Sequence, residues 1–154
     1  MDTYFFDSSA IVKRYVNETG SNFVENLTNL KSGNLVLLAR ITQVEVASAF
    51  ARRLKSGSLT QNETDDALKL FQHDLTNNYF VIEVTSNLLF EATRLAIKYA
   101  LRGYDAVQLA SAVETNNERI AQGLLPLILV SADTDLNDAA KLEGFTIENP
   151  NNHP

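Results

Sequence analysis

Five short apolar runs, separated by helix-like segments, constrain the fold of this chain most strongly. They predict strands over residues 3–6, 35–39, 79–84, 126–130 and 145–148. The run "LVLLA" at 35–39 does not alternate apolar and polar residues, as is typical of a strand that is covered on both faces. Strands separated by helices form a parallel sheet with helices on both faces. The pattern therefore predicts a three-layer α/β/α fold around a mostly parallel sheet of four to five strands.

The segments between these strands have helical patterns. We expect helices over residues 8–16, 22–30, 42–55, 60–75, 86–101, 104–118 and 133–142. Ser8 or Ser9 would cap the first helix, Thr60 would open the fourth, and Gly144 would end the last. With 154 residues, 45% of them hydrophobic, the chain fits one compact domain. We assign residues 1–148 to that domain and residues 149–154 to a polar tail.

Composition also bears on the cellular compartment. The chain has no cysteine, which excludes a disulfide framework and a zinc–thiolate site. The N-terminus lacks the basic lead and apolar stretch of a signal peptide, and the longest apolar run, residues 124–132, is too short to span a bilayer. We therefore expect a cytoplasmic protein without a membrane segment.

The net charge of −6 opposes nucleic-acid binding, because phosphate contacts require local positive charge. The charge is unevenly distributed, however. Residues 1–55 carry seven Lys or Arg against five Asp or Glu, whereas the remainder carries six against fourteen. The N-terminal part can therefore still face a polyanion.

Four acidic residues fall where the predicted strands end or the following helices begin. Asp7 and Asp133 each lie just after a predicted strand, and Glu45 and Asp105 lie in the first turns of helices. Sites in open parallel sheets form beyond the carboxyl ends of the strands. We therefore expect these four acids to meet at one edge of the sheet.

Helix capping is the alternative interpretation for most of these acids. Asp7 and Asp133 are residues that accept backbone N–H groups at helix N-termini. Thr42 and Glu45 fit a capping box, so capping and metal binding both remain open for Glu45. Asp105 fits capping less well, because it lies on an apolar helix face, where a carboxylate needs a partner or a cation.

Together, the four acids predict a metal site. Mg²⁺ and Mn²⁺ prefer carboxylate oxygens and water, and such ions assist displacement at a phosphoryl group. The residues and motifs that other catalytic chemistries require are absent. The two histidines lie in a long helix and in the tail, and the chain has no G-x-S-x-G, G-x-G-x-x-G or other glycine-rich phosphate loop.

Four segments resemble the four acidic motifs of the PIN domain, in order and over essentially the whole chain. They are "YFFDSSAIVKRYVNETGS", "ITQVEVASAFARR", "LRGYDAVQLASA" and "LVSADTDLNDAAKLEGF". Within that family they look most like VapC-type toxins. The resemblance implies a PIN-like fold and a Mg²⁺- or Mn²⁺-dependent endoribonuclease that leaves 5′-phosphate and 3′-hydroxyl ends.

The resemblance also implies roles for individual residues. The acidic positions fall on Asp7, Glu45, Asp105 and Asp133, and the S-x-D pattern favours Asp133 over Asp135 as the fourth acid. The supporting hydroxyls fall on Ser8 or Ser9 and on Ser131. Arg14, Arg52 and Arg53 follow acids of this set by one or two helical turns, and we expect some of them to contact RNA phosphates.

Two alternatives within the family are a housekeeping RNA-processing nuclease and a catalytically silent PIN-like binding module. A receiver-like phosphoacceptor domain fits less well, because it needs paired acids after the first strand and a lysine after the last.

The family resemblance further implies two protein partners, a small antitoxin and a second copy of the chain in a homodimer. We expect the antitoxin peptide to dock in a groove between the helices around residues 8–31 and 41–75, which carry Phe23, Val24, Phe50 and Phe71.

Overall fold

A computed structural model describes all 154 residues and contains one five-stranded sheet in the order β3-β2-β1-β4-β5. All four strand pairs are parallel, so the predicted fold is confirmed and the sheet has no antiparallel edge. The strands are β1 (Thr3–Phe6), β2 (Leu35–Ala39), β3 (Phe80–Ile82), β4 (Ile128–Val130) and β5 (Thr146–Glu148).

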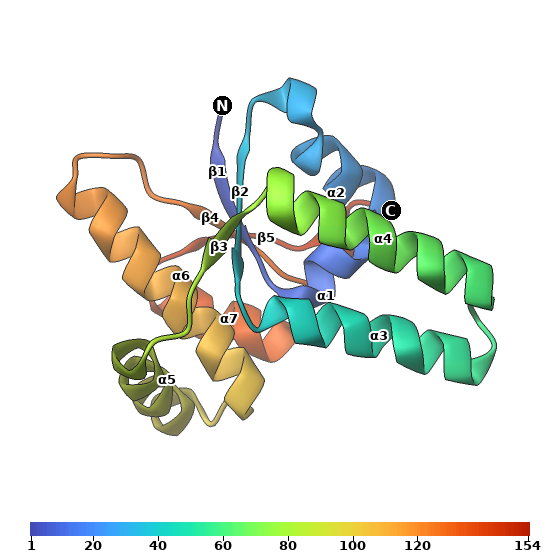
Figure 1. Cartoon of the computed structure of the whole chain (residues 1–154). Helices are drawn as coiled ribbons and strands as arrows, with labels where there is room; N and C mark the ends of the chain where they lie inside the picture. Colours follow the sequence, from blue (N-terminus) through green and yellow to red (C-terminus); the bar gives the residue numbers. More distant parts are fainter.

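Helices cover both faces of the sheet. Figure 1 shows α5 and α6 on one side and α2, α3 and α4 on the other. None of the helices is long and apolar enough to cross a membrane. The α-helices are α1 (Ser8–Ile11), α2 (Ser21–Thr28), α3 (Thr42–Ser56), α4 (Gln61–Asn77), α5 (Ser86–Tyr99), α6 (Gly103–Ala121) and α7 (Thr134–Leu142), and the 3₁₀ helices are η1 (Val12–Arg14), η2 (Leu30–Ser32) and η3 (Pro150–Asn152).

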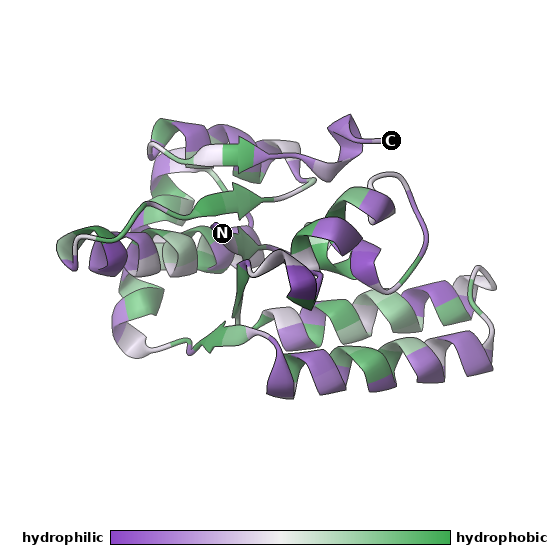
Figure 2. Ribbon diagram, turned by 90° about the horizontal axis from the view of Figure 1, so that it is seen from above, coloured by the Kyte–Doolittle hydropathy of each residue, from purple (hydrophilic) through white to green (hydrophobic).

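The sheet divides the apolar interior into two cores. In β1, Phe5 joins the core under α5, α6 and α7, whereas Tyr4 and Phe6 join the core under α1 to α4. This separation follows from the pleat, which directs successive side chains to opposite faces. In Figure 2 the strands are coloured hydrophobic along much of their length, consistent with a sheet that is buried on both faces.

Local structure differs from the sequence prediction at several helix boundaries. The predicted helix 8–16 is only a single α-helical turn, Ser8–Ile11, continued by the 3₁₀ helix η1. Its cap is Asp7 and not Ser8 or Ser9, because the Asp7 carboxylate accepts the Ala10 N–H. A serine cap was therefore the wrong prediction, whereas the capping interpretation given for Asp7 is confirmed.

The capping box predicted for Thr42 and Glu45 is also absent. Ile41 precedes α3 without a side-chain cap, and the Thr42 hydroxyl accepts a hydrogen bond from Gln108 instead. A capping box does form at α4, where Thr60 and Glu63 bond reciprocally to the backbone.

The apolar residues proposed to line a docking groove are mostly interior. Val24, Phe50 and Phe71 belong to the core under α1 to α4 and are essentially fully buried. These three side chains therefore cannot form an open groove, and that prediction was wrong. The helices α3 and α4 pack against each other, and their buried apolar side chains belong to the same core.

The C-terminal residues 149–154 pack against the domain. Pro150 is buried, and its carbonyl lies so near Gly20 that a Cβ there would approach it to 2.3 Å. Gly20 also has a φ of +87°, so this position requires glycine for two reasons. The His153 ring stacks on Phe23 at 3.8 Å between centroids. The segment therefore fixes the turn that precedes α2.

Candidate active site

A cleft of about 670 Å³ opens beyond the carboxyl ends of the central strands β1 and β4, and all four predicted acids line it. Asp7 follows β1 and donates its backbone N–H to Val130 of β4, while Asp133 precedes α7. Glu45 and Asp105 come from the first turns of α3 and α6. The parallel sheet thus brings together residues that are up to 126 positions apart in the chain.

Asp7 is the most enclosed of these acids, with 3% of its surface exposed. The single Ser9 hydroxyl proton is shared between its two oxygens, at 2.7 and 2.8 Å, and the Ser131 hydroxyl donates to Oδ2 at 2.8 Å. The Ala10 N–H donates to Oδ1 at 3.0 Å. Three donors serve a carboxylate that can accept about four hydrogen bonds, so Asp7 keeps acceptor capacity toward the cleft.

Glu45 is held by two side chains from other elements. The Ser8 hydroxyl donates to its Oε2 at 2.9 Å, and the Gln108 amide donates to its Oε1 at 2.7 Å. Gln108 is 1% exposed and also donates to the Thr42 hydroxyl at 2.9 Å. Glu45 is therefore oriented toward the cleft and does not act as a helix cap.

Asp133 caps α7 and also faces the cleft. Its Oδ1 accepts the Leu136 N–H at 2.9 Å, which confirms the capping interpretation without removing the carboxylate from the cleft. Arg102 lies 3.6 Å from an oxygen of Asp105 and 3.7 Å from an oxygen of Asp133. The adjacent acid, Asp135, is exposed and does not line the cleft.

Two acids of the cleft, Asp7 and Asp105, have raised pKa values. Burial raises the pKa of Asp7 from 3.8 to about 7 in spite of its hydrogen bonds, and the charge of Glu45 adds to the rise. Burial, and then the charge of Asp133, raise the pKa of Asp105 to about 6, although Arg102 opposes the shift. Ionising these carboxyl groups together is therefore unfavourable without a cation.

These residues fit a hard divalent cation by chemistry. No three acidic or histidine side chains are gathered closely enough to form a ready-made cage. The donor set nevertheless consists of carboxylate oxygens with room for water, which Mg²⁺ prefers over a cage made only of protein ligands. Burial is the main cause of the raised pKa values of Asp7 and Asp105, and neighbouring carboxylates add to both, so a bound cation would favour the ionised forms.

The other end of the cleft is basic. Arg52 and Arg53 line it from α3, together with Lys13 of η1 and with Glu18. Arg14 does not line the cleft; its guanidinium lies over the Tyr15 ring and 3.9 Å from Glu25. The structure therefore brings two of the three predicted arginines to the acidic site and leaves the third outside.

The sequence analysis missed several polar residues of this region, among them Lys13, Glu18, Arg102 and Gln108. Gln108 had a readable signal, because it interrupts the same apolar helix face that singled out Asp105. Lys13 sits between an apolar run and Arg14, and no local pattern marks it as buried. Arg102 became relevant only when the fold placed the start of α6 beside Asp133.

Together, the parallel α/β/α fold and the carboxylate-lined cleft at the strand ends define a class of domain with an acidic, metal-compatible site. The chain belongs to the PIN domain family, whose model matches residues 4–142. It is similar to Ribonuclease VapC49 of Mycobacterium tuberculosis (strain ATCC 25618 / H37Rv), with 35% identity over 113 residues that cover 73% of this chain and 76% of the relative. Ribonuclease VapC45 of Mycobacterium tuberculosis (strain CDC 1551 / Oshkosh) is similar to the same extent.

Solved structures of low sequence identity share the fold. VapBC2 from Rickettsia felis, bound to a DNA fragment from its promoter, matches with a TM-score of 0.63 and 15% identity, covering 96% of this chain and 98% of that chain. Mycobacterium tuberculosis VapC20, a sarcin-ricin loop cleaving toxin, matches with a TM-score of 0.62 and 16% identity, covering 93% and 96%.

Proposed function

We propose that this protein is a metal-dependent endoribonuclease that acts as the toxin of a toxin–antitoxin pair. The observation that carries the proposal is the convergence of four carboxylates on one cleft, with the buried Asp7 at its floor. The two relatives named ribonucleases support RNA as the substrate, because they share 35% identity over most of the chain.

Asp7, Glu45 and Asp105 would hold Mg²⁺ or Mn²⁺, and Asp133 would complete the site directly or through water. When bound, the ion would supply Lewis acidity at the scissile phosphate and lower the pKa of water. Neutralisation of the acids by the cation would also let the polyanionic substrate approach the cleft.

The chain's own residues orient these ligands. Ser9 and Ser131 fix the two oxygens of Asp7, and Ser8 fixes Glu45. These hydroxyls donate to carboxylates, so we assign them to ligand orientation and not to nucleophilic attack. Arg52 and Arg53 would contact phosphates that flank the scissile bond, because they line the same cleft on α3.

A small antitoxin would control this activity. An arginine from its C-terminal segment would be attracted to the acidic end of the cleft and could displace the cation. A toxin–antitoxin complex from Klebsiella pneumoniae, which shares the fold, supports a partner of this kind. We also propose a homodimer that forms through helices; α5 exposes Phe90 and Ile97, which are 75% and 80% accessible.

RNA cleavage by the purified chain in Mn²⁺ tests the enzyme assignment. We expect wild-type protein to produce fragments with 5′-phosphate ends, Asp105→Asn to produce none, and EDTA to stop the reaction. Asp138→Asn is the matched control, because Asp138 is an exposed acid outside the cleft. Cleavage retained by Asp105→Asn would contradict the site assignment.

Co-expression with the protein encoded by the adjacent short reading frame tests the toxin assignment. We expect a stable complex on sizing and suppression of cleavage. If the neighbour neither binds nor inhibits, and the chain alone is harmless to its host, a housekeeping RNA-processing nuclease replaces the toxin. A chain that binds RNA without cleaving it would instead be a binding module.

A further inference from the structure

The basic end of the cleft contains a single carboxylate, Glu18, that contacts two cations. Its Oε1 lies 3.0 Å from the Lys13 ammonium, and its Oε2 accepts a hydrogen bond from the Arg53 guanidinium. Lys13 also donates to the Thr19 carbonyl at 2.8 Å. One anion therefore occupies a position between a lysine and an arginine, which is the arrangement of a small anion-binding site.

These cations are more enclosed than ordinary surface charges. The side chain of Lys13 is 6% exposed and that of Arg53 is 31% exposed. Desolvating a lysine to this extent is unfavourable unless an anion accompanies it. Burial acts to raise the pKa of Glu18, but the hydrogen bonds from Arg53 and Lys13 outweigh burial and keep the pKa below its usual range.

The location of this group points to a phosphate as the alternative anion. Arg53 lies eight residues after Glu45 on α3, which is about 12 Å along the helix axis. An RNA whose scissile phosphate lies at the carboxylate end of the cleft would therefore place a different backbone phosphate near Arg53. Carboxylate and phosphate oxygens both match the guanidinium donors, so they compete for the same arginine.

We propose that Lys13 and Arg53 form a subsite for a backbone phosphate beside the scissile bond, and that Glu18 occupies this subsite as a built-in competitor in the free protein. The inference rests on the proposed function in taking RNA as the ligand. RNA binding then requires the Glu18 carboxylate to leave both cations before the phosphate can enter.

Local geometry permits this exchange without a change of fold. Glu18 lies in the connection between η1 and α2, and its backbone N–H donates to the Ser21 hydroxyl at 2.9 Å. The Ser21 hydroxyl in turn donates to the Val16 carbonyl at 3.1 Å. The backbone of Pro150 lies close against the neighbouring Gly20. The backbone is thus held while the Glu18 side chain, 25% exposed, can rotate toward solvent.

Equilibrium binding of a single-stranded RNA oligonucleotide tests the proposal. The measurements use the full chain in the Asp105→Asn background, which prevents turnover. We expect Glu18→Gln to lower Kd roughly three- to tenfold, as for one gained charge-assisted contact. The slope of log K against log salt should steepen by roughly 0.7 for each phosphate gained. Adding Arg53→Met to Glu18→Gln should abolish the gain.

Glu25→Gln is the matched control, because it removes the same charge and releases Arg14 outside the cleft. An equal gain in RNA affinity from Glu25→Gln would mean that net charge alone is responsible and would overturn the proposal. Unchanged or weaker binding by Glu18→Gln would also overturn it.

A second variant covers the case in which Glu18→Gln fails to fold. Glu18→Asp keeps the charge but is too short to reach both cations, and we expect a smaller decrease in Kd; an unchanged or raised Kd would contradict the subsite. Failure of the proposed function is a separate result, because it appears as absent cleavage by the wild-type chain and not as a binding difference.

Discussion

Replacing Asp7 by asparagine should stabilise the metal-free protein at pH 8. The rise in pKa from 3.8 to about 7 corresponds to ~4 kcal/mol of unfavourable free energy for ionising Asp7 in the folded chain. Asparagine removes this cost and can still accept the Ala10 N–H as a helix cap. Allowing for weaker bonds to Ser9 and Ser131, we expect a net gain of about 2 kcal/mol, or roughly 4–8 °C in Tm.

The pH dependence of this gain identifies its cause. Between pH 4 and pH 7 the folded chain keeps a proton on Asp7 that the unfolded chain releases, so the stability of the wild-type protein falls as pH rises through this window. Above the pKa of Asp7 in the folded chain, the full unfavourable free energy of ionising this carboxyl group is present. The advantage of Asp7→Asn should therefore shrink by ~2–3 kcal/mol between pH 8 and pH 5.

Urea unfolding in EDTA at both pH values provides the assay. Comparing each variant with wild type at the same pH largely cancels the titration of groups shared by both. The control is Asp138→Asn, which removes an exposed carboxylate outside the cleft and should show no comparable gain. A stability difference for Asp7→Asn that is independent of pH, or a destabilised variant at pH 8, would refute the electrostatic reasoning.

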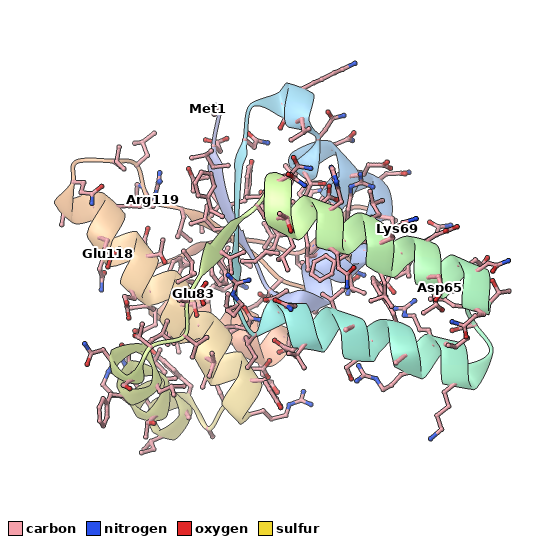
Figure 3. The ribbon with its side chains drawn as sticks, viewed as in Figure 1. Met1, Asp65, Lys69, Glu83, Glu118 and Arg119 are labelled. Atoms are coloured by element: carbon pink, nitrogen blue, oxygen red, sulfur yellow. The ribbon has the colours of Figure 1, made fainter.

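Three further predictions concern residues around the cleft. Asp133→Asn should abolish RNA cleavage, whereas Asp135→Asn should retain it, because only Asp133 lines the cleft. Arg52→Met should flatten the salt dependence of RNA binding by roughly 0.7 in log–log slope, while Lys69→Met, on α4 and outside the cleft (Figure 3), should leave the slope unchanged. Gln108→Leu should lower kcat for RNA cleavage roughly 10- to 100-fold, because it removes a hydrogen bond that orients Glu45. An unchanged kcat would show that Gln108 does not orient Glu45 for catalysis.

The sequence predicted the layers and the strands because these depend on local hydrophobic pattern. β1 and β2 appear at their predicted residues, and the helix between each pair of strands makes a parallel sheet almost unavoidable. The same topology let Asp7 and Asp133 be placed at one edge without coordinates, since both follow strands that proved to be adjacent.

Hydrogen-bond partners were harder to predict, because they depend on contacts between distant segments. The motif at Thr42 and Glu45 has the local form of a capping box. Gln108, more than 60 residues away, instead donates hydrogen bonds to the Thr42 hydroxyl and to one oxygen of Glu45. Phe50 and Phe71 looked available for a partner only because the sequence does not show how α3 and α4 pack. Tertiary contacts decided each of these cases.

Binding of Mn²⁺ measured by titration calorimetry tests most directly whether the four acids act as one metal site. We expect saturable binding to the wild-type chain, loss of binding in Asp105→Asn, and wild-type affinity in Asp135→Asn, whose exposed carboxylate lies outside the cleft. Equal affinity for Mn²⁺ in all three proteins, or no binding to the wild-type chain, would contradict the assignment of this cleft as a metal-dependent active site.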